Sequence, residues 1–179
     1  MAVEAGDVLG FVDESSQSLN ANTQRLWSFE KARFKRKIVH IRANSIGCYM
    51  LNGTSVITFP KHTKCDDFCA FLEDVRVHNP MKRICLILDN FATHKAKTVH
   101  ERARFLNIEL IFLPPYSPDL NPIEFIWKSM KRFISIRSIE NTVELIAEVE
   151  YYFRTLAMSL SFAHSWIKKF LEDKLNLLG

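Results

Sequence analysis

The segment FLPPYSPDLNPIEFIWKSMKR, residues 112–132, joins a short apolar strand to an amphipathic helix through a turn with four prolines. Proline has no backbone N–H and a fixed φ, so the cluster ends the strand abruptly and the helix begins at Pro122. The expected helix runs to about Ile134 and carries one acid, Glu124, among apolar residues. With Asn121 as N-cap, this acid occupies the third helical position, where it suits a capping box and the helix dipole. A helix cap is therefore one interpretation of Glu124.

Apolar patterning predicts strands and helices in alternation around this turn. Strands are expected at residues 8–15, 37–51, 53–59, 83–89 and 108–113. Helices are expected at residues 65–78, 95–107, 122–134, 142–156 and 162–175. The second and third strands are expected to pair as antiparallel neighbours through the turn Asn52–Thr54. RICLILD, residues 83–89, is apolar on both faces, as is typical of a strand inside a covered sheet.

This order of elements predicts an α/β fold. Three antiparallel strands come first, followed by alternating helices and strands, which indicates a mixed five-stranded sheet with helices on both faces. The ribonuclease-H-like fold has this order. We expect residues 1–179 to form one domain, because the length suits a single core and no repeat or domain boundary is evident. A flavodoxin-like or receiver-like domain, with Asp89 as phosphoacceptor, is an alternative that the antiparallel opening disfavours.

Composition indicates a soluble intracellular protein, with 47% apolar and 25% charged residues and a net charge of +4. No apolar run approaches the roughly 18 residues of a membrane span, and the N-terminus does not resemble a signal peptide. The cysteines do not follow a zinc-binding pattern, and we expect reduced thiols at Cys48, Cys65, Cys69 and Cys85.

Cations are concentrated in two runs. Residues 29–37, FEKARFKRK, contain five cations and one acid, and residues 128–132, KSMKR, contain three cations. Such runs form either an ordinary solvated face or a surface that contacts phosphates.

Three acids lie where the predicted elements would expose them. Asp13 closes the first strand, Asp89 closes the most apolar strand, and Glu124 opens the helix after the proline turn. Sites in open α/β sheets form beyond the carboxyl ends of the strands. Each acid also has a structural interpretation. Asp13 could start a turn with Ser15 and Ser16, Asp89 could form an Asx turn, and Glu124 could be a cap. No single acid decides between these interpretations.

Two motifs together resemble a known family. LILDNFATHKA, residues 86–96, and LPPYSPDLNPIEFIWKSMKR, residues 113–132, place 34 residues between the second and third acids. They closely resemble the catalytic domain of DDE transposases, in the mariner-like superfamily and its prokaryotic insertion-sequence relatives. FVDESSQSLN, residues 11–20, is similar to the first-acid segment of that family, and RLWSF, residues 25–29, is similar to the arginine and tryptophan found after that segment. The resemblance covers roughly residues 8–170.

The resemblance implies that Asp13, Asp89 and Glu124 are catalytic metal ligands. Hard ions such as Mg²⁺ or Mn²⁺ prefer oxygen ligands, and two ions can clamp the attacking and leaving oxygens of a phosphoryl displacement. The implied activity is cleavage of DNA at transposon ends and transfer of the freed 3′-hydroxyl to target DNA. The family also implies a prokaryotic, nucleoid-associated cytoplasmic protein without membrane contact.

Neighbouring residues are expected to contact DNA or to position the acids. The candidate DNA-binding residues are Asn90, His94, Lys95, Tyr116, Ser117, Lys128 and Lys131. For Asn90 and His94, positioning of the site is the alternative role. Lys128 and Lys131 follow Glu124 at four and seven residues, on one helical face. Asp119 in the proline turn is a second candidate for the third acid, which the family pattern disfavours.

Relatives carry an N-terminal helix-turn-helix region that recognises transposon ends, and nothing in this sequence resembles it. We therefore expect a separately encoded or split-off catalytic portion, or an excised piece, with the end-binding region on a separate polypeptide as one arrangement. The family implies a homodimer. Two other functions stay open, a nuclease of the same fold acting on RNA–DNA hybrids or branched DNA, and an inactive DNA-binding module descended from a transposase.

Overall fold

The computed structural model describes residues 6–18, 41–80 and 82–171. The basic run at residues 29–37, the RLWSF segment and the first residues of the expected second strand lie outside the described residues. In the described part of the chain, no helix has both the length and the apolar character that a membrane span requires.

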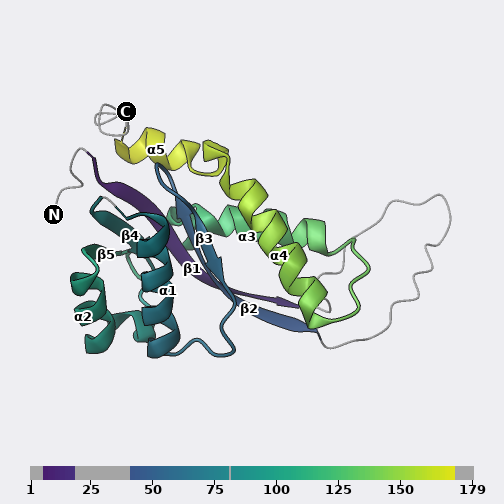
Figure 1. The fold of residues 1–179 in the computed structure, drawn as a ribbon. Helices are drawn as coiled ribbons and strands as arrows, with labels where there is room; N and C mark the ends of the chain where they lie inside the picture. The colour runs from purple at the N-terminus through teal and green to yellow at the C-terminus, as the bar shows by residue number, and fades with distance from the viewer. Residues whose placement is uncertain (1–5, 19–40, 81, 172–179) are drawn as a thin grey trace.

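One five-stranded sheet organises the fold (Figure 1). Its strands are β1 (Val8–Ser18), β2 (Arg42–Met50), β3 (Val56–Thr58), β4 (Ile84–Leu88) and β5 (Ile108–Phe112). The order across the sheet is β3-β2-β1-β4-β5. The first three strands pair antiparallel, β4 pairs parallel to β1, and β5 pairs parallel to β4. This arrangement confirms the predicted mixed sheet with an antiparallel opening.

β1 is longer than the sequence indicated. It continues to Ser18, and Asp13 lies within the strand opposite Gly47, so the prediction that Asp13 closes the strand is wrong. The parallel pairing of β1 with β4 ends at Phe11, two residues before Asp13. Beyond that point β1 continues on its antiparallel pairing with β2 alone, and Asp13 reaches the edge where β4 ends.

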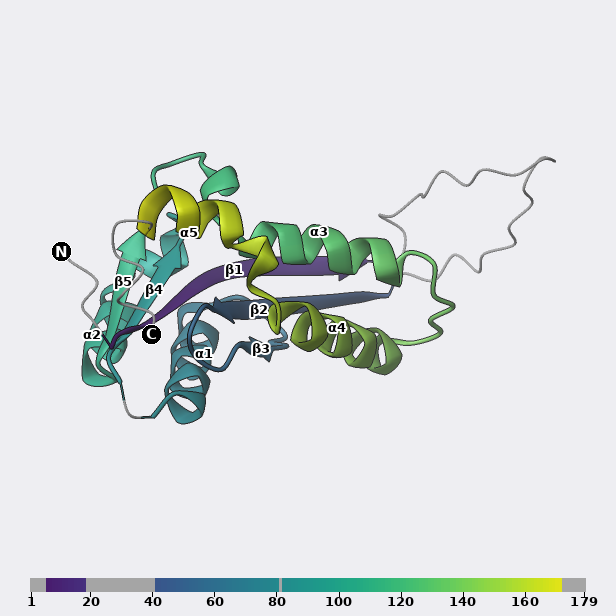
Figure 2. The ribbon, with the colours of Figure 1, turned by 90° about the horizontal axis from the view of Figure 1, so that it is seen from above.

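Helices cover both faces of the sheet (Figure 2). They are α1 (Cys65–His78), α2 (Lys97–Phe105), α3 (Ile123–Ile134), α4 (Thr142–Ala157) and α5 (His164–Leu171). Apolar side chains of α3 and α4 form one core with Phe11, and those of α1 and α2 form the other with Val12. Neighbouring residues of β1 thus point to opposite cores, as the pleat of a strand requires.

Short 3₁₀ turns precede two of the predicted helices. The helix expected at residues 95–107 is α2, which begins at Lys97 after the turn η2 (Ala92–Lys95), and a further turn, η4 (Leu160–Phe162), precedes α5. Another, η3 (Pro118–Leu120), lies within the proline turn.

Candidate active site

Asp13, Asp89 and Glu124 line one cleft of about 420 Å³. Asp89 directly follows β4, Asp13 lies on the neighbouring strand β1, and Glu124 lies in the first turn of α3. The proline turn after β5 forms the opposite wall with Pro114 and Ser117. The fold therefore brings three acids from distant parts of the sequence to the carboxyl end of the parallel strands.

Asp13 is held by the core of the protein. The indole Nε1 of Trp127 donates a hydrogen bond to Asp13 Oδ2 at 2.9 Å, and Trp127 is 1% exposed. The ring packs against Phe153, with ring centroids 5.2 Å apart. Burial, and then the negative charge of Glu124, raise the pKa of Asp13 to about 7. The carboxylate is fixed in place but its charge is disfavoured, as expected of an acid that faces other acids.

Asp89 is held at one of its two oxygens. Its Oδ1 accepts a hydrogen bond from the backbone N–H of Phe91 at 3.0 Å and one from Nδ1 of His94 at 3.1 Å. The bond from His94 lowers the pKa of Asp89. The contact with Phe91 is the Asx turn that the sequence offered as a structural role for Asp89. The side chain of Asp89 is nevertheless 56% exposed, so its carboxylate also faces the cleft.

The buried side chain of His94 contacts two acids, Asp89 and Glu14. It is 1% exposed, and its Nε2 lies 3.4 Å from Oε1 of Glu14, which is an ion-pair contact too poorly aligned for a hydrogen bond. Burial lowers the pKa of His94, but the carboxylates of Asp89 and Glu14 outweigh it and raise this pKa to about 9. His94 is buried where it binds Asp89, which favours the positioning role over the expected contact with DNA.

Glu124 does more than begin a helix. Its pKa is raised by burial and by the charge of Asp89, while Lys131 acts in the opposite direction. Asn121, predicted as the N-cap, uses its side chain differently, because its Nδ2 donates to the carbonyl of Val12 at 3.1 Å. The structure shows no side-chain cap on α3, and the turn is instead tied directly to β1.

The composition of the cleft fits a divalent cation. Within the described residues, no three histidine, cysteine or acidic side chains already stand close enough together to hold an ion. However, each of the three acids carries a hard oxygen ligand, and Asp13 and Glu124 have raised pKa values because they are partly buried and face negative charge. A cation between them would remove that repulsion.

The other predicted residues divide between the cleft and its surroundings. Asn90, Tyr116 and Ser117 line the cleft, and Nδ2 of Asn90 donates to the carbonyl of Leu113. The ammonium of Lys95 lies over the ring of Phe112, 5.9 Å from its centroid.

Residues of the adjacent helix and turn lie elsewhere. Lys131 interacts with Glu124, whereas Lys128 and Asp119 line a neighbouring groove. Asp119, the alternative third acid, does not line the cleft.

Sequence reasoning missed three residues that hold the site. Trp127 has the apolar character of a core residue and is buried, but its indole N–H also binds Asp13. Glu14 was not singled out, although it directly follows Asp13. Asn121 was read as a local cap, whereas its partner lies 109 residues away.

Comparisons with known proteins identify the family and the fold. Residues 8–146 match the model of the family described as DDE superfamily endonuclease. The chain belongs to this family, and its fold is that of a ribonuclease-H-like transposase catalytic domain.

Individual relatives are transposases. The Tcb2 transposase of Caenorhabditis briggsae is 29% identical over 72 residues, which are 40% of this chain and 26% of that protein. The Mos1 mariner paired end complex with Mn has a TM-score of 0.70 at 17% identity, over 92% of this chain and 52% of that chain. The Mos1 strand transfer complex has a TM-score of 0.65 at 17% identity, over 94% of this chain and 52% of that chain. The chain thus spans about half of the Mos1 chains, and the nematode relative does not support the expected prokaryotic origin.

Proposed function

We propose that this chain is a transposase catalytic domain that cuts DNA phosphodiesters and joins the freed end to new DNA. Asp13, Asp89 and Glu124 would hold Mg²⁺ or Mn²⁺, with two ions in the cleft. The observation that carries this proposal is the convergence of three mutually repelling carboxylates, from three separate elements, on one cleft. Related structures support it, since the mariner Mos1 paired end complex is known with Mn and with Mg.

The chain would contribute position and charge. Divalent ions, when bound, would polarise the phosphodiester and activate the attacking oxygen. Trp127 fixes Asp13, and His94 fixes Asp89 at Oδ1, so the two carboxylates keep their places as charge in the cleft changes. Asn121 ties the turn before Glu124 to β1. Positioning of this kind is the main contribution a protein makes to phosphoryl transfer.

The cleft walls would contact DNA. Asn90, Tyr116 and Ser117 line the cleft and present polar groups and an aromatic ring toward it. Lys131 lies near Glu124 and is proposed to meet a phosphate. A nuclease of the same fold would use the same acids on RNA–DNA hybrids, and formation of a strand-transfer product distinguishes the two functions.

Recognition of transposon ends is proposed to need further protein. Because the chain covers only part of its relatives, a helix-turn-helix region, on this protein or on a separate polypeptide, would bring the ends to the cleft. Pairing of two ends would use a homodimer.

Thermal unfolding with Mn²⁺ tests the metal site. At about ten times the dissociation constant, the ion should stabilise the wild type by about 1.4 kcal/mol, which raises Tm by about 3–6 °C in a domain of this size. Asp13→Asn should lose this shift. Because the substitution removes a half-buried charge that faces Glu124, the ion-free variant should be at least as stable as the wild type. Equal shifts in both proteins would contradict the proposed site.

Tyr116→Gly tests the cleft wall. Tyr116 has a left-handed φ of 56° and is fully exposed, so glycine relieves strain and removes no buried surface. Stability should change by at most about 1 kcal/mol, since glycine also costs entropy on folding. Affinity for single-stranded DNA should fall about five-fold or more if the ring stacks on a base.

A matched control comes from a second left-handed residue. Asn107 has a φ of 52° and lies before β5, at the opposite end of the parallel strands. Asn107→Gly should leave DNA affinity unchanged. The same affinity in Tyr116→Gly and wild type, measured by fluorescence anisotropy, would remove Tyr116 from the DNA contacts.

A further inference from the structure

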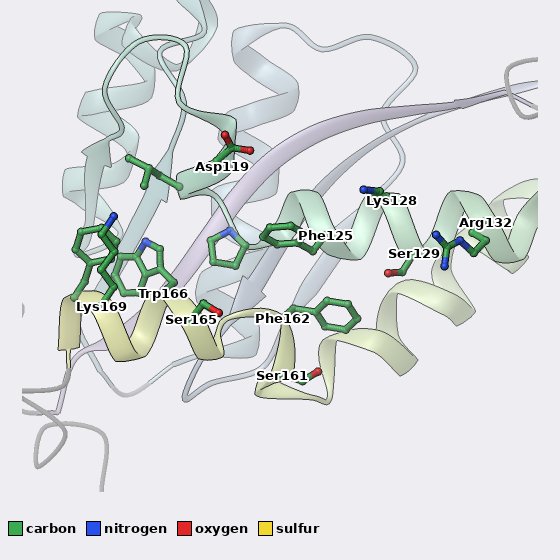
Figure 3. Close-up of a pocket in the computed structure, with 13 residues that line it drawn as sticks. Asp119, Phe125, Lys128, Ser129, Arg132, Ser161, Phe162, Ser165, Trp166 and Lys169 are labelled. Atoms are coloured by element: carbon green, nitrogen blue, oxygen red, sulfur yellow. The ribbon is translucent and has the colours of Figure 1, made fainter.

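A second groove lies beside the candidate active site, between α3 and the segment formed by η4 and α5 (Figure 3). Its volume is about 610 Å³, larger than that of the cleft. Phe125, Ser129 and Arg132 project from α3 toward this groove, and Trp166 and Lys169 project into it from α5 (Figure 3).

The groove combines positive charge with aromatic surface. Among its lining residues, Lys128, Arg132 and Lys169 are cations and Asp119 is the single acid. Phe125 is 47% exposed and Phe170 46% exposed, so the groove presents two large apolar side chains to solvent. Exposed apolar surface surrounded by polar groups marks an interaction site. The charge indicates that its partner is an anion.

The aromatic side chains are held in fixed positions. The ring of Trp166 packs edge-on against buried Phe11, with centroids 4.8 Å apart. Phe170 lies against this indole as well, at 5.1 Å, and the ammonium of Lys169 lies over the Phe170 ring, 5.1 Å from its centroid. These contacts place a rigid aromatic surface and a cation side by side, as required for a base and its neighbouring phosphate.

The groove adjoins the cleft along the proline turn. Pro118 and Asn121 of the proline turn line the cleft, while Asp119 and Pro122 line the groove. Glu124 faces the cleft, whereas the next residue, Phe125, faces the groove. One short turn therefore separates the two, and a strand that leaves the cleft would have to cross only this turn to enter the groove.

We propose that this groove binds a single strand of DNA that continues from the active-site cleft. Its phosphates would contact Lys128, Arg132 and Lys169, and an unpaired base would stack on Phe125 or on the Trp166–Phe170 surface. Stacking requires an unpaired base, which favours a single strand over a duplex. An excess of cations favours a nucleic acid over a peptide of mixed charge. The inference rests on the proposed function, since the strand is the one that the cleft processes.

Fluorescence anisotropy with labelled oligothymidylate, in the presence of EDTA, tests the groove. Lys128→Glu/Lys169→Glu should weaken binding at least about ten-fold at low salt. The slope of log K against log salt should fall by about 1.4, because each contact with a single strand contributes about 0.7. Lys82→Glu/Arg104→Glu makes the same change in net charge on exposed residues before β4 and β5, at the opposite end of the sheet, and should retain the slope.

A second pair of variants tests stacking. Phe125→Ala should weaken binding about five-fold or more. Phe105→Ala removes an equally large ring that is 78% exposed on α2 and should have no effect. Duplex DNA of the same length should bind more weakly than the single strand in the wild type.

Each outcome decides the proposal. Groove variants that bind like their controls, or a wild type that prefers the duplex, would overturn it. Altered self-association in sedimentation, with unchanged affinity for the single strand, would show a protein interface and also overturn it. Because these measurements exclude divalent ions, their failure is distinct from failure of the Mn²⁺ stabilisation that tests the proposed function.

Discussion

Asp89→Asn is expected to lower the rate of DNA cleavage about 10³-fold or more. The substitution keeps the size of the side chain and leaves an oxygen that can still accept from Phe91 N, so the local backbone should be preserved. It replaces a negatively charged carboxylate, which binds a divalent ion, by a neutral amide, which binds the ion more weakly. The transition state should then lose several kcal/mol of stabilisation by the ion. Such a loss corresponds to a factor of this size, since each 1.36 kcal/mol changes the rate ten-fold.

Cleavage and strand transfer should be measured on DNA that carries the element's ends, with Mg²⁺ and with Mn²⁺. Asp74→Asn is the matched control. Asp74 is an exposed aspartate on α1, which covers the face of the sheet opposite to α3. This variant should cleave at the wild-type rate. Equal rates for Asp89→Asn and the wild type would remove Asp89 from the chemistry, whatever the fate of the other acids.

Trp127→Ala is expected to lower the free energy of unfolding by about 3–5 kcal/mol, the largest effect on stability among these substitutions. Trp127 is fully buried between the sheet and Phe153, and it packs so closely on β2 that a Cβ on Gly47 would lie 2.6 Å from the indole. Alanine would leave a large cavity in this core and would also leave Asp13 without its hydrogen bond.

Trp127→Phe separates the two effects. It retains most of the apolar contact but removes the N–H that binds Asp13, which should cost about 1–3 kcal/mol. Chemical denaturation measures both variants. If Trp127→Phe and the wild type had the same stability and the same Mn²⁺ stabilisation, the indole–Asp13 contact would be irrelevant to the site.

The sequence predicted best where local pattern and tertiary structure agree. The helix Cys65–His78 has the predicted bounds, because its apolar positions coincide with the buried face. β4 was predicted as a strand covered on both faces, and all of its residues are buried. Asp89 and Glu124 could be located from the motifs around them.

Prediction failed where a long-range contact overrides a local preference. β1 was expected to stop near Ser15, but pairing with β2 carries it to Ser18. Asn121 has the local signature of an N-cap, yet its amide is used on the carbonyl of Val12. His94 was expected either to contact DNA or to position the site, and its burial against Glu14, on a distant strand, could not be inferred from the loop around it. The groove between α3 and α5 could not be predicted, because only the packing of α5 beside α3 creates it.

The most direct test of the proposed function is a crystal structure of the protein with Mn²⁺, with the ions located by anomalous scattering. We expect one or two strong peaks in the cleft, each within about 2–2.3 Å of carboxylate oxygens, with Asp13, Asp89 and Glu124 all used as ligands. Glu124 should have moved toward the other two acids, with the Trp127 and His94 contacts that hold Asp13 and Asp89 retained. Manganese bound elsewhere, with the three carboxylates still apart, would contradict the proposed metal site.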